Sequence, residues 1–148
     1  MKRNLGCLMS ILHRQSQIYI NCSLKKFNIS SAEYAFLMYL YKNNGATQDE
    51  LSSYLYIDKS ATARAIKSLE EKGYVIKNKD DLDKRYNRVY LTNKAITYKD
   101  KIREAVWGWN KLLTKDIDPA ALDLILSSLE KMVNIVESTD IKKELEEL

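Results

Sequence analysis

The residues best suited to chemistry in this sequence lie on one side of a predicted helix that follows Asp58. This side is small and basic and carries no bulky apolar group. An arginine there can donate two hydrogen bonds to the edge of a guanine, and short neighbouring side chains let the helix backbone come close to a base pair. The pattern suits a helix in a DNA major groove, with a predicted groove-facing set of Lys59, Ser60, Ala63, Arg64 and Lys67.

The ends and the opposite face of this helix explain how that side is positioned. Asp58 can cap the first turn, because its carboxylate can accept hydrogen bonds from free backbone N–H groups. Gly73 stands where a left-handed residue ends a helix. The side expected to pack on the protein repeats at helical spacing and consists of Thr62, Ala65, Ile66 and Leu69.

A two-stranded wing is predicted after this helix. The β-rich runs 74–76 and 89–91 flank a charged segment, 79–85, that is expected to be too polar to pack. A bland interpretation is a solvated hairpin with a surface ion pair, which would contribute less than about 1 kcal/mol. We favour DNA contact, and the candidate residues in the wing are Asp83, Lys84, Arg85 and Arg88.

Two capping boxes precede the helix that begins after Asp58. Ser30 with Glu33 opens one predicted helix, and Thr47 with Glu50 opens a second, short one. The short helix ends almost directly before Asp58. A short helix, a tight turn and a second helix make a helix-turn-helix.

Long amphipathic helices are predicted on both sides of this region. They span about 4–26, 93–115 and 119–136, and the last begins with an Asp118-Pro119 start signal. Apolar stripes of this length exceed what one small domain covers, so contact with partner helices is a natural use for them. On helix 93–115 the inner side is expected to comprise Ile96, Ile102, Val106, Trp109 and Leu113.

Composition narrows the class of protein. The chain has 148 residues, of which 45% are hydrophobic and 30% charged, as in one folded domain that is mainly α with a small β hairpin. No apolar run reaches membrane-spanning length, and we expect a cytoplasmic protein. With two cysteines and one histidine, no zinc site is expected. We expect no cofactor and no enzyme activity, because neither a nucleophile–base pair nor a phosphate-binding glycine loop is visible.

The charge is unevenly distributed along the chain. Residues 58–94 carry ten basic and six acidic side chains, whereas residues 116–148 carry three and nine. The basic excess coincides with the predicted helix and wing. Together with these elements it favours nucleic acid as the partner.

The motifs of this region, in their order and spacing, resemble the MarR family of bacterial transcription regulators. They are Asp58-Lys59-Ser60, Thr62-Ala63-Arg64-Ala65, Leu69-Glu70-Glu71-Lys72-Gly73-Tyr74, Asp83-Lys84-Arg85 and Leu91-Thr92. The resemblance implies one MarR-like domain over 1–148. Within it, dimerisation helices occupy 1–28 and 116–148, a winged helix-turn-helix occupies 30–92 and a linking helix occupies 93–115.

The resemblance also implies a mechanism. A homodimer would bind double-stranded DNA at a palindromic operator and, as is usual in the family, would act as a repressor. In the wing, Asp83 and Arg85 would brace each other so that the arginine enters the minor groove. A small aromatic effector would bind near the dimer helices, where the candidate lining residues are His13, Arg14, Tyr19, Tyr39 and Tyr41. An oxidant acting at Cys7 is a second candidate signal. The alternative is that Cys7 is an unreactive thiol packed as a small hydrophobic residue.

A winged helix can also serve as a protein-interaction or RNA-binding module without an operator. The feature that favours DNA binding over these alternatives is the basic, small-residue face. A gel shift with random duplex DNA tests it, because no binding at low salt would favour the protein-contact alternative.

Overall fold

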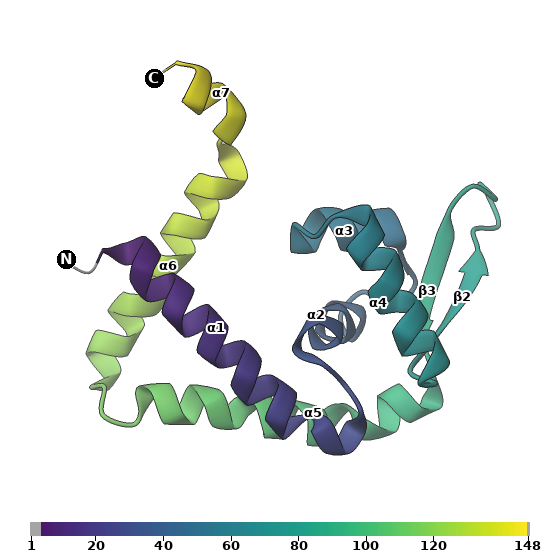
Figure 1. The fold of residues 1–148 in the computed structure, drawn as a ribbon, viewed down its shortest axis with the longest axis horizontal. Helices are drawn as coiled ribbons and strands as arrows, with labels where there is room; N and C mark the ends of the chain where they lie inside the picture. The colour runs from purple at the N-terminus through teal and green to yellow at the C-terminus, as the bar shows by residue number, and fades with distance from the viewer. Residues whose placement is uncertain (1–3, 148) are drawn as a thin grey trace. The chain divides into compact units, whose positions relative to one another are not determined.

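The computed structural model of the chain describes residues 4–147, so residues 1–3 and 148 of the predicted dimerisation helices lie outside the described residues. The chain divides into two compact units, the first ending at Trp109 and the second beginning at Asn110. The architecture is mainly α with a small antiparallel sheet, as predicted (Figure 1). The elements that begin in the first unit are α1 (Leu5–Ser23), η1 (Lys25–Phe27), α2 (Ser31–Leu40), β1 (Ala46–Thr47), α3 (Gln48–Leu55), α4 (Lys59–Glu71), β2 (Val75–Lys79), β3 (Asn87–Leu91) and α5 (Asn93–Thr114).

Both predicted capping boxes are confirmed. The Ser30 hydroxyl accepts from the Glu33 N–H at 3.2 Å, and the Glu33 carboxylate accepts from the Ser30 N–H at 2.9 Å. The Thr47 hydroxyl and the Glu50 carboxylate make the same reciprocal pair at 3.1 and 2.8 Å. Each box satisfies backbone donors that a helix leaves free at its first turn. α2 and α3 therefore begin where the sequence places them.

The sheet has three strands where the sequence predicts two. β3 lies between β1 and β2, with Ala46 opposite Val89 and Val75 opposite Leu91. The hairpin strands also extend further toward the wing tip than the predicted runs. β1 has two residues, which is too short for an alternating pattern to show in a sequence. This strand ties the start of α3 to the wing.

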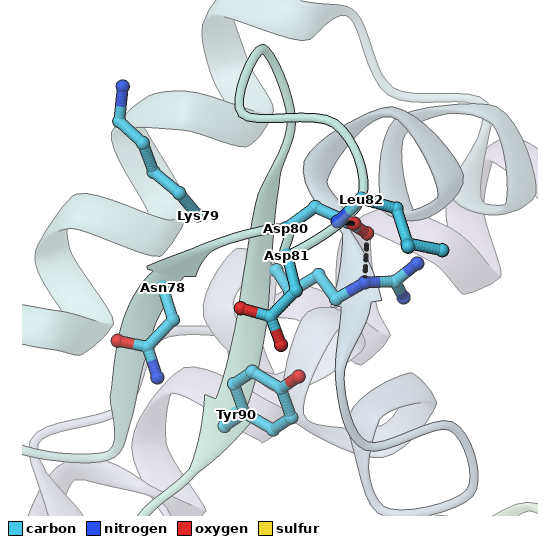
Figure 2. Close-up of a pocket in the computed structure, with 7 residues that line it drawn as sticks. Asn78, Lys79, Asp80, Asp81, Leu82 and Tyr90 are labelled. Atoms are coloured by element: carbon cyan, nitrogen blue, oxygen red, sulfur yellow. Dashed lines mark hydrogen bonds and ion pairs between the residues drawn. The ribbon is translucent and has the colours of Figure 1, made fainter.

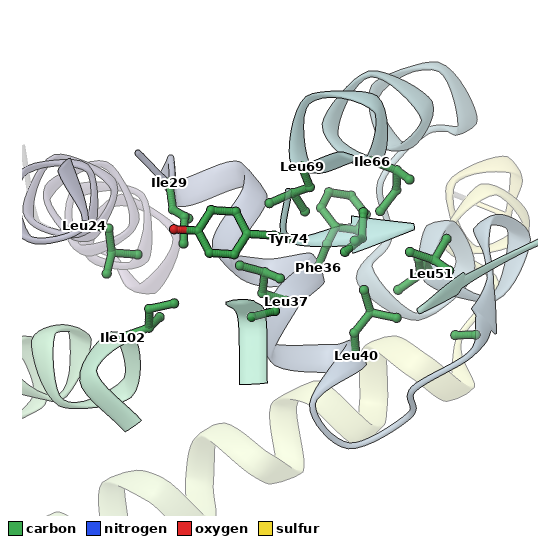
Figure 3. Close-up of a cluster of buried hydrophobic side chains, with 14 residues drawn as sticks. Leu24, Ile29, Phe36, Leu37, Leu40, Leu51, Ile66, Leu69, Tyr74 and Ile102 are labelled. Carbon is green, nitrogen blue, oxygen red and sulfur yellow. The ribbon is translucent and has the colours of Figure 1, made fainter. Parts of the chain in front are cut away.

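The core of the first unit gathers side chains from the helices and the sheet. Tyr74 lies among them, 1% exposed, and its hydroxyl donates to the Phe27 carbonyl at 2.5 Å (Figure 3). On α5 the inner positions belong to Ala95 and Ile102, both fully buried. The prediction for Ile96 is wrong, since this side chain is 55% exposed. A one-residue offset turns a side chain about 100° around a helix, so the small alanine occupies the core position.

The second unit contains the end of α5, then α6 (Pro119–Ser138) and α7 (Ile141–Glu146). Asp118 caps α6 through a hydrogen bond from the Ala121 N–H at 3.0 Å, and Pro119 follows, as predicted. α6 buries no residue within the chain. Its exposed large apolar side chains are Leu124, Ile125, Leu126, Leu129, Val133, Ile135 and Val136. In the part of the chain from 4 to 147, no helix has the length and apolar character needed to cross a membrane.

Candidate nucleic-acid interface

α4 has the caps that its sequence predicts. The Asp58 carboxylate accepts from the Ala61 N–H at 2.8 Å, and the Thr62 hydroxyl donates to the Asp58 carbonyl at 2.9 Å. At the other end Gly73 has a φ of +81°, the left-handed conformation expected there. α3 packs against α4, which completes the helix-turn-helix, and β2 follows beside α4 (Figure 1).

The two faces of α4 differ sharply in exposure. Thr62, Ile66 and Leu69 are fully buried, and Ala65 is partly buried. All five residues of the predicted groove-facing set are exposed: Lys59, Ser60, Ala63, Arg64 and Lys67. The side with the arginine is therefore free of the protein's own core. Lys59 also lies 3.4 Å from an Asp49 carboxylate oxygen on α3, an exposed pair that solvent screens.

At the wing tip Arg85 and Asp83 brace each other, as the resemblance implies. Arg85 donates from Nε at 3.0 Å and from Nη2 at 2.6 Å to the Asp83 carboxylate. The side-chain hydrogen bond from Arg85 lowers the pKa of Asp83 below its usual value. The Arg85 side chain is 84% exposed. The bracing fixes the direction of the guanidinium while it remains open to a ligand.

The wing loop is expected to be too polar to pack, and this prediction is wrong at Asp80. This residue is 8% exposed and accepts from the Leu82 N–H at 2.7 Å and from the Arg88 guanidinium (Figure 2). Arg88 also donates to the Gly45 carbonyl at 2.9 Å. The backbone hydrogen bond from Leu82, and after it the one from Arg88, lower the pKa of Asp80.

Arg88 thus differs from the other basic candidates in the wing. Its hydrogen bonds are made within the protein, joining the wing loop to the segment before β1, whereas Lys84 is exposed. The sequence could not show this, because Asp80 and Arg88 become neighbours only when the hairpin forms.

The five candidate effector residues are not brought together. Tyr19 packs on Trp109 with ring centroids 5.4 Å apart, and Tyr39 packs on Tyr54 at 4.4 Å. The Tyr41 hydroxyl donates to the Ala95 carbonyl at 2.7 Å, and burial, with smaller contributions from nearby tyrosines and Asp100, raises the pKa of Tyr41 to about 12. Arg14 donates to the hydroxyl of Ser10 on the same helix.

Of the five, His13 lines a cavity of about 520 Å³ between α1, α2 and the end of α3. Sequence reasoning missed the other lining residues, which come from three helices and the turn after α3 and share no motif. They include Gln17, Ile20, Tyr34, Leu55 and Ile57. Cys7 is a half-buried free thiol and Cys22 an exposed one. Within residues 4–147, no three side chains of His, Cys, Asp or Glu gather as a metal site would need.

The chain is similar to known transcriptional regulators. A family model described as the MarR family matches residues 27–85. Among curated proteins, the HTH-type transcriptional regulator BilQ of Clostridioides difficile (strain CD3) is 26% identical over 144 residues, which is 97% of this chain and 93% of that protein.

Solved structures extend the likeness over nearly the whole chain. A MarR transcriptional regulator from Methanosarcina mazei Go1 is 37% identical, with a TM-score of 0.87 and coverage of 91% of this chain and 98% of that one. A MarR family transcriptional regulator from Listeria monocytogenes complexed with 26mer DNA shares the fold, at 24% identity, a TM-score of 0.83 and coverage of 92% and 90%. The chain described here belongs to the MarR family of transcriptional regulators.

Proposed function

We propose that this chain is a homodimeric repressor that binds double-stranded DNA at an imperfect palindrome. One observation carries the proposal: α4 keeps its cationic, small-residue side exposed while its opposite side is buried in the core. A helix presented in this way suits a major groove. The Listeria regulator of the same fold, which is complexed with 26mer DNA, supports DNA as the ligand.

Within this interface the basic residues have different tasks. Arg64 reads a base edge, because its guanidinium can fork onto guanine. Lys59, Lys67 and Lys84 contact phosphates, which positions the protein without selecting a sequence. Arg85, directed by Asp83, enters the minor groove, where a guanidinium is attracted by the negative potential.

Exposed apolar surface supports the dimer. α1 leaves Leu8, Met9 and Leu12 between 41% and 49% exposed, and α6 leaves a long row of apolar side chains in water. Patches of this kind mark interaction sites on soluble proteins. In a dimer with two-fold symmetry the two copies of α4 would read equivalent half-sites, about 34–36 Å apart.

The signal that releases the DNA is proposed to be a small molecule or an oxidant. A cavity of about 520 Å³ lies in the size range of small-molecule sites and is lined by His13 and Tyr34. The oxidant alternative would act at the free thiol of Cys7. A thermal-shift screen with aromatic acids, and a DNA-release assay with peroxide, separate the two.

Selection of bound sequences from a random duplex pool tests the proposal. The selected sites should share an imperfect palindrome. Arg64→Ala should weaken binding to a selected duplex by about 1–3 kcal/mol and relax the preference at one position. Arg103→Ala removes an exposed arginine from α5 and serves as the matched control. Parent-like binding by both Arg64→Ala and Arg85→Ala would refute the assignment.

A further inference from the structure

α4 is joined to the first turn of α2 by a buried carboxylate. Glu33 is 6% exposed. It accepts from the Ser68 hydroxyl at 2.6 Å and from Lys72 Nζ at 2.9 Å to each oxygen. Oε2 also accepts from the Ser30 N–H at 2.9 Å. A carboxylate has about four acceptor sites, so Glu33 is fully occupied.

Stability alone is a poor explanation for this arrangement. Burial would raise the pKa of Glu33, but the hydrogen bonds from Ser68, Lys72 and the Ser30 N–H outweigh it, so the pKa is lowered and the group is ionised at neutral pH. The cost of removing two charges from water offsets much of their attraction. The core around Leu37 and Leu69 already holds α2 to α4. Apolar packing has no preferred direction, whereas the hydrogen bonds of the Glu33 carboxylate are directional.

The two side-chain donors, Ser68 in α4 and Lys72 at its C-cap, lie next to the DNA-facing side of the helix. Arg64, Ser68 and Lys72 are spaced i, i+4, i+8, so they follow one ridge of the helix. Turning α4 by about 20° would move its surface, about 5 Å from the axis, by about 2 Å. A hydrogen bond to a base edge tolerates only a few tenths of an ångström around its usual length. Fixing Ser68 therefore fixes the position on the helix surface from which Arg64 projects.

The first turn of α2 is itself anchored on its other side. The Ser31 N–H donates to the Asn21 side-chain oxygen on α1 at 2.6 Å. The capping box at Ser30 holds the same turn rigid. α2 thus offers a fixed reference to which Glu33 ties α4.

The geometry points to Glu33 as a positioning residue that sets the direction of the DNA-reading side of α4 through Ser68 and Lys72. The inference rests on the proposed function. Because Glu33 is buried, it acts on discrimination between sequences and leaves phosphate attraction to the exposed lysines.

The test compares binding to a duplex selected by the parent protein with binding to random duplex DNA, each over a range of salt concentrations. The double variant Glu33→Gln/Lys72→Met keeps the net charge and leaves an amide that can accept from the Ser30 N–H. Thermal unfolding checks that it folds. Ser68→Ala is a milder variant that removes one hydroxyl. Glu50→Gln is the control for loss of a capping-box carboxylate, since Glu50 bonds to Thr47 at the start of α3.

We expect the double variant to lose about tenfold in the ratio of selected to random affinity. Its salt dependence on random DNA should match that of the parent, because the phosphate contacts remain. Ser68→Ala should shift the ratio in the same direction by less, and Glu50→Gln should leave it unchanged. A folded double variant that discriminates as well as the parent refutes the positioning role alone. A parent that binds both duplexes equally refutes the proposed function and this inference together.

Discussion

Two arginines three residues apart in the wing have opposite environments. The Arg85 side chain is 84% exposed and is held by Asp83, whereas Arg88 divides its hydrogen bonds between Asp80 and the Gly45 carbonyl. A planar guanidinium can serve two acceptors at once, which a lysine ammonium cannot do in the same geometry. We therefore assign DNA contact to Arg85 and support of the wing to Arg88.

Substitution at the two positions should separate these roles. Arg88→Lys keeps the charge but cannot bond Asp80 and the Gly45 carbonyl at once. The melting temperature should therefore fall by roughly 2–4 °C, and a protease should cut the wing faster. Arg85→Ala should leave the melting temperature unchanged and weaken DNA binding. Differential scanning fluorimetry, limited proteolysis and a gel shift measure the three quantities. Equal effects of both variants on stability would contradict the assignment.

The sequence predicts residues whose roles are local and misses those that depend on a distant partner. Asp58 and Gly73 were predicted because a cap depends on its own turn. The burial of Asp80 depends on Arg88 across the hairpin, so it gives no local signal in the sequence. The sequence identifies Glu33 as a capping residue, but its bond to Lys72 spans 39 positions and gives no signal in the sequence.

At the scale of elements, α1 and α5 are in contact where the Tyr19 side chain packs against Gly108. A Cβ built at Gly108 would lie 2.3 Å from the Tyr19 hydroxyl oxygen and 3.4 Å from the ring carbon that carries it. The Tyr19 ring is also packed on Trp109 at 5.4 Å, which limits its freedom to move away. The absence of a side chain at 108 therefore lets the two helices keep this contact.

A double-mutant cycle tests the contact. Gly108→Ala alone should gain about 1 kcal/mol of helix propensity and lose about 1–3 kcal/mol to overpacking. Combined with Tyr19→Phe, which removes the clashing oxygen, the propensity gain should remain. We expect a positive coupling of about 1–2 kcal/mol in urea unfolding. Additive effects would show that the helices separate without cost. Tyr39→Phe, on α2, is the matched control for loss of a tyrosine hydroxyl.

The junction of α2 and α4 should make stability depend on pH. The folded protein lowers the pKa of Glu33 below 4.5, because the hydrogen bonds outweigh burial, so the unfolded chain binds this proton more tightly. The stabilisation is present above about pH 4.5 and is lost as the pH falls through the folded value. Glu33→Gln should flatten the fall in melting temperature below pH 4.5. Some slope should remain from Asp80, whose pKa is also lowered. Identical slopes for parent and variant would contradict this.

The helical elements themselves were largely predictable, because caps and the 3.6-residue period are local signals. Ser30, Thr47 and Asp118 start helices where the sequence places them. The effector residues were not predictable in the same way. Tyr19, Tyr39 and Tyr41 fit a pocket by type, but each packs on a different neighbour, and a cavity is a property of how helices pack.

At the scale of the whole chain, α6 of the second unit buries none of its residues. α6 exposes Leu129, Val133 and Val136 at 38%, 54% and 52%. The segment 116–148 is also strongly acidic, with nine acidic and three basic residues. Its charge makes it unsuited to DNA, and its apolar row suits a second copy of the chain.

We therefore expect Leu129→Glu to reduce the parent mass from twice the 17.2 kDa chain to that of a single chain, as measured by sedimentation equilibrium. A charge in a desolvated interface is unfavourable, so association should weaken. Lys131→Glu introduces the same residue on the opposite side of α6, about 160° from the centre of the apolar row, and should remain a dimer. Because a single chain reads only one half-site, Leu129→Glu should also lose most of its affinity for a palindromic duplex while binding one half-site as the parent subunit does. A parent protein that sediments as a single chain would refute the dimer and, with it, the expectation of a palindromic operator.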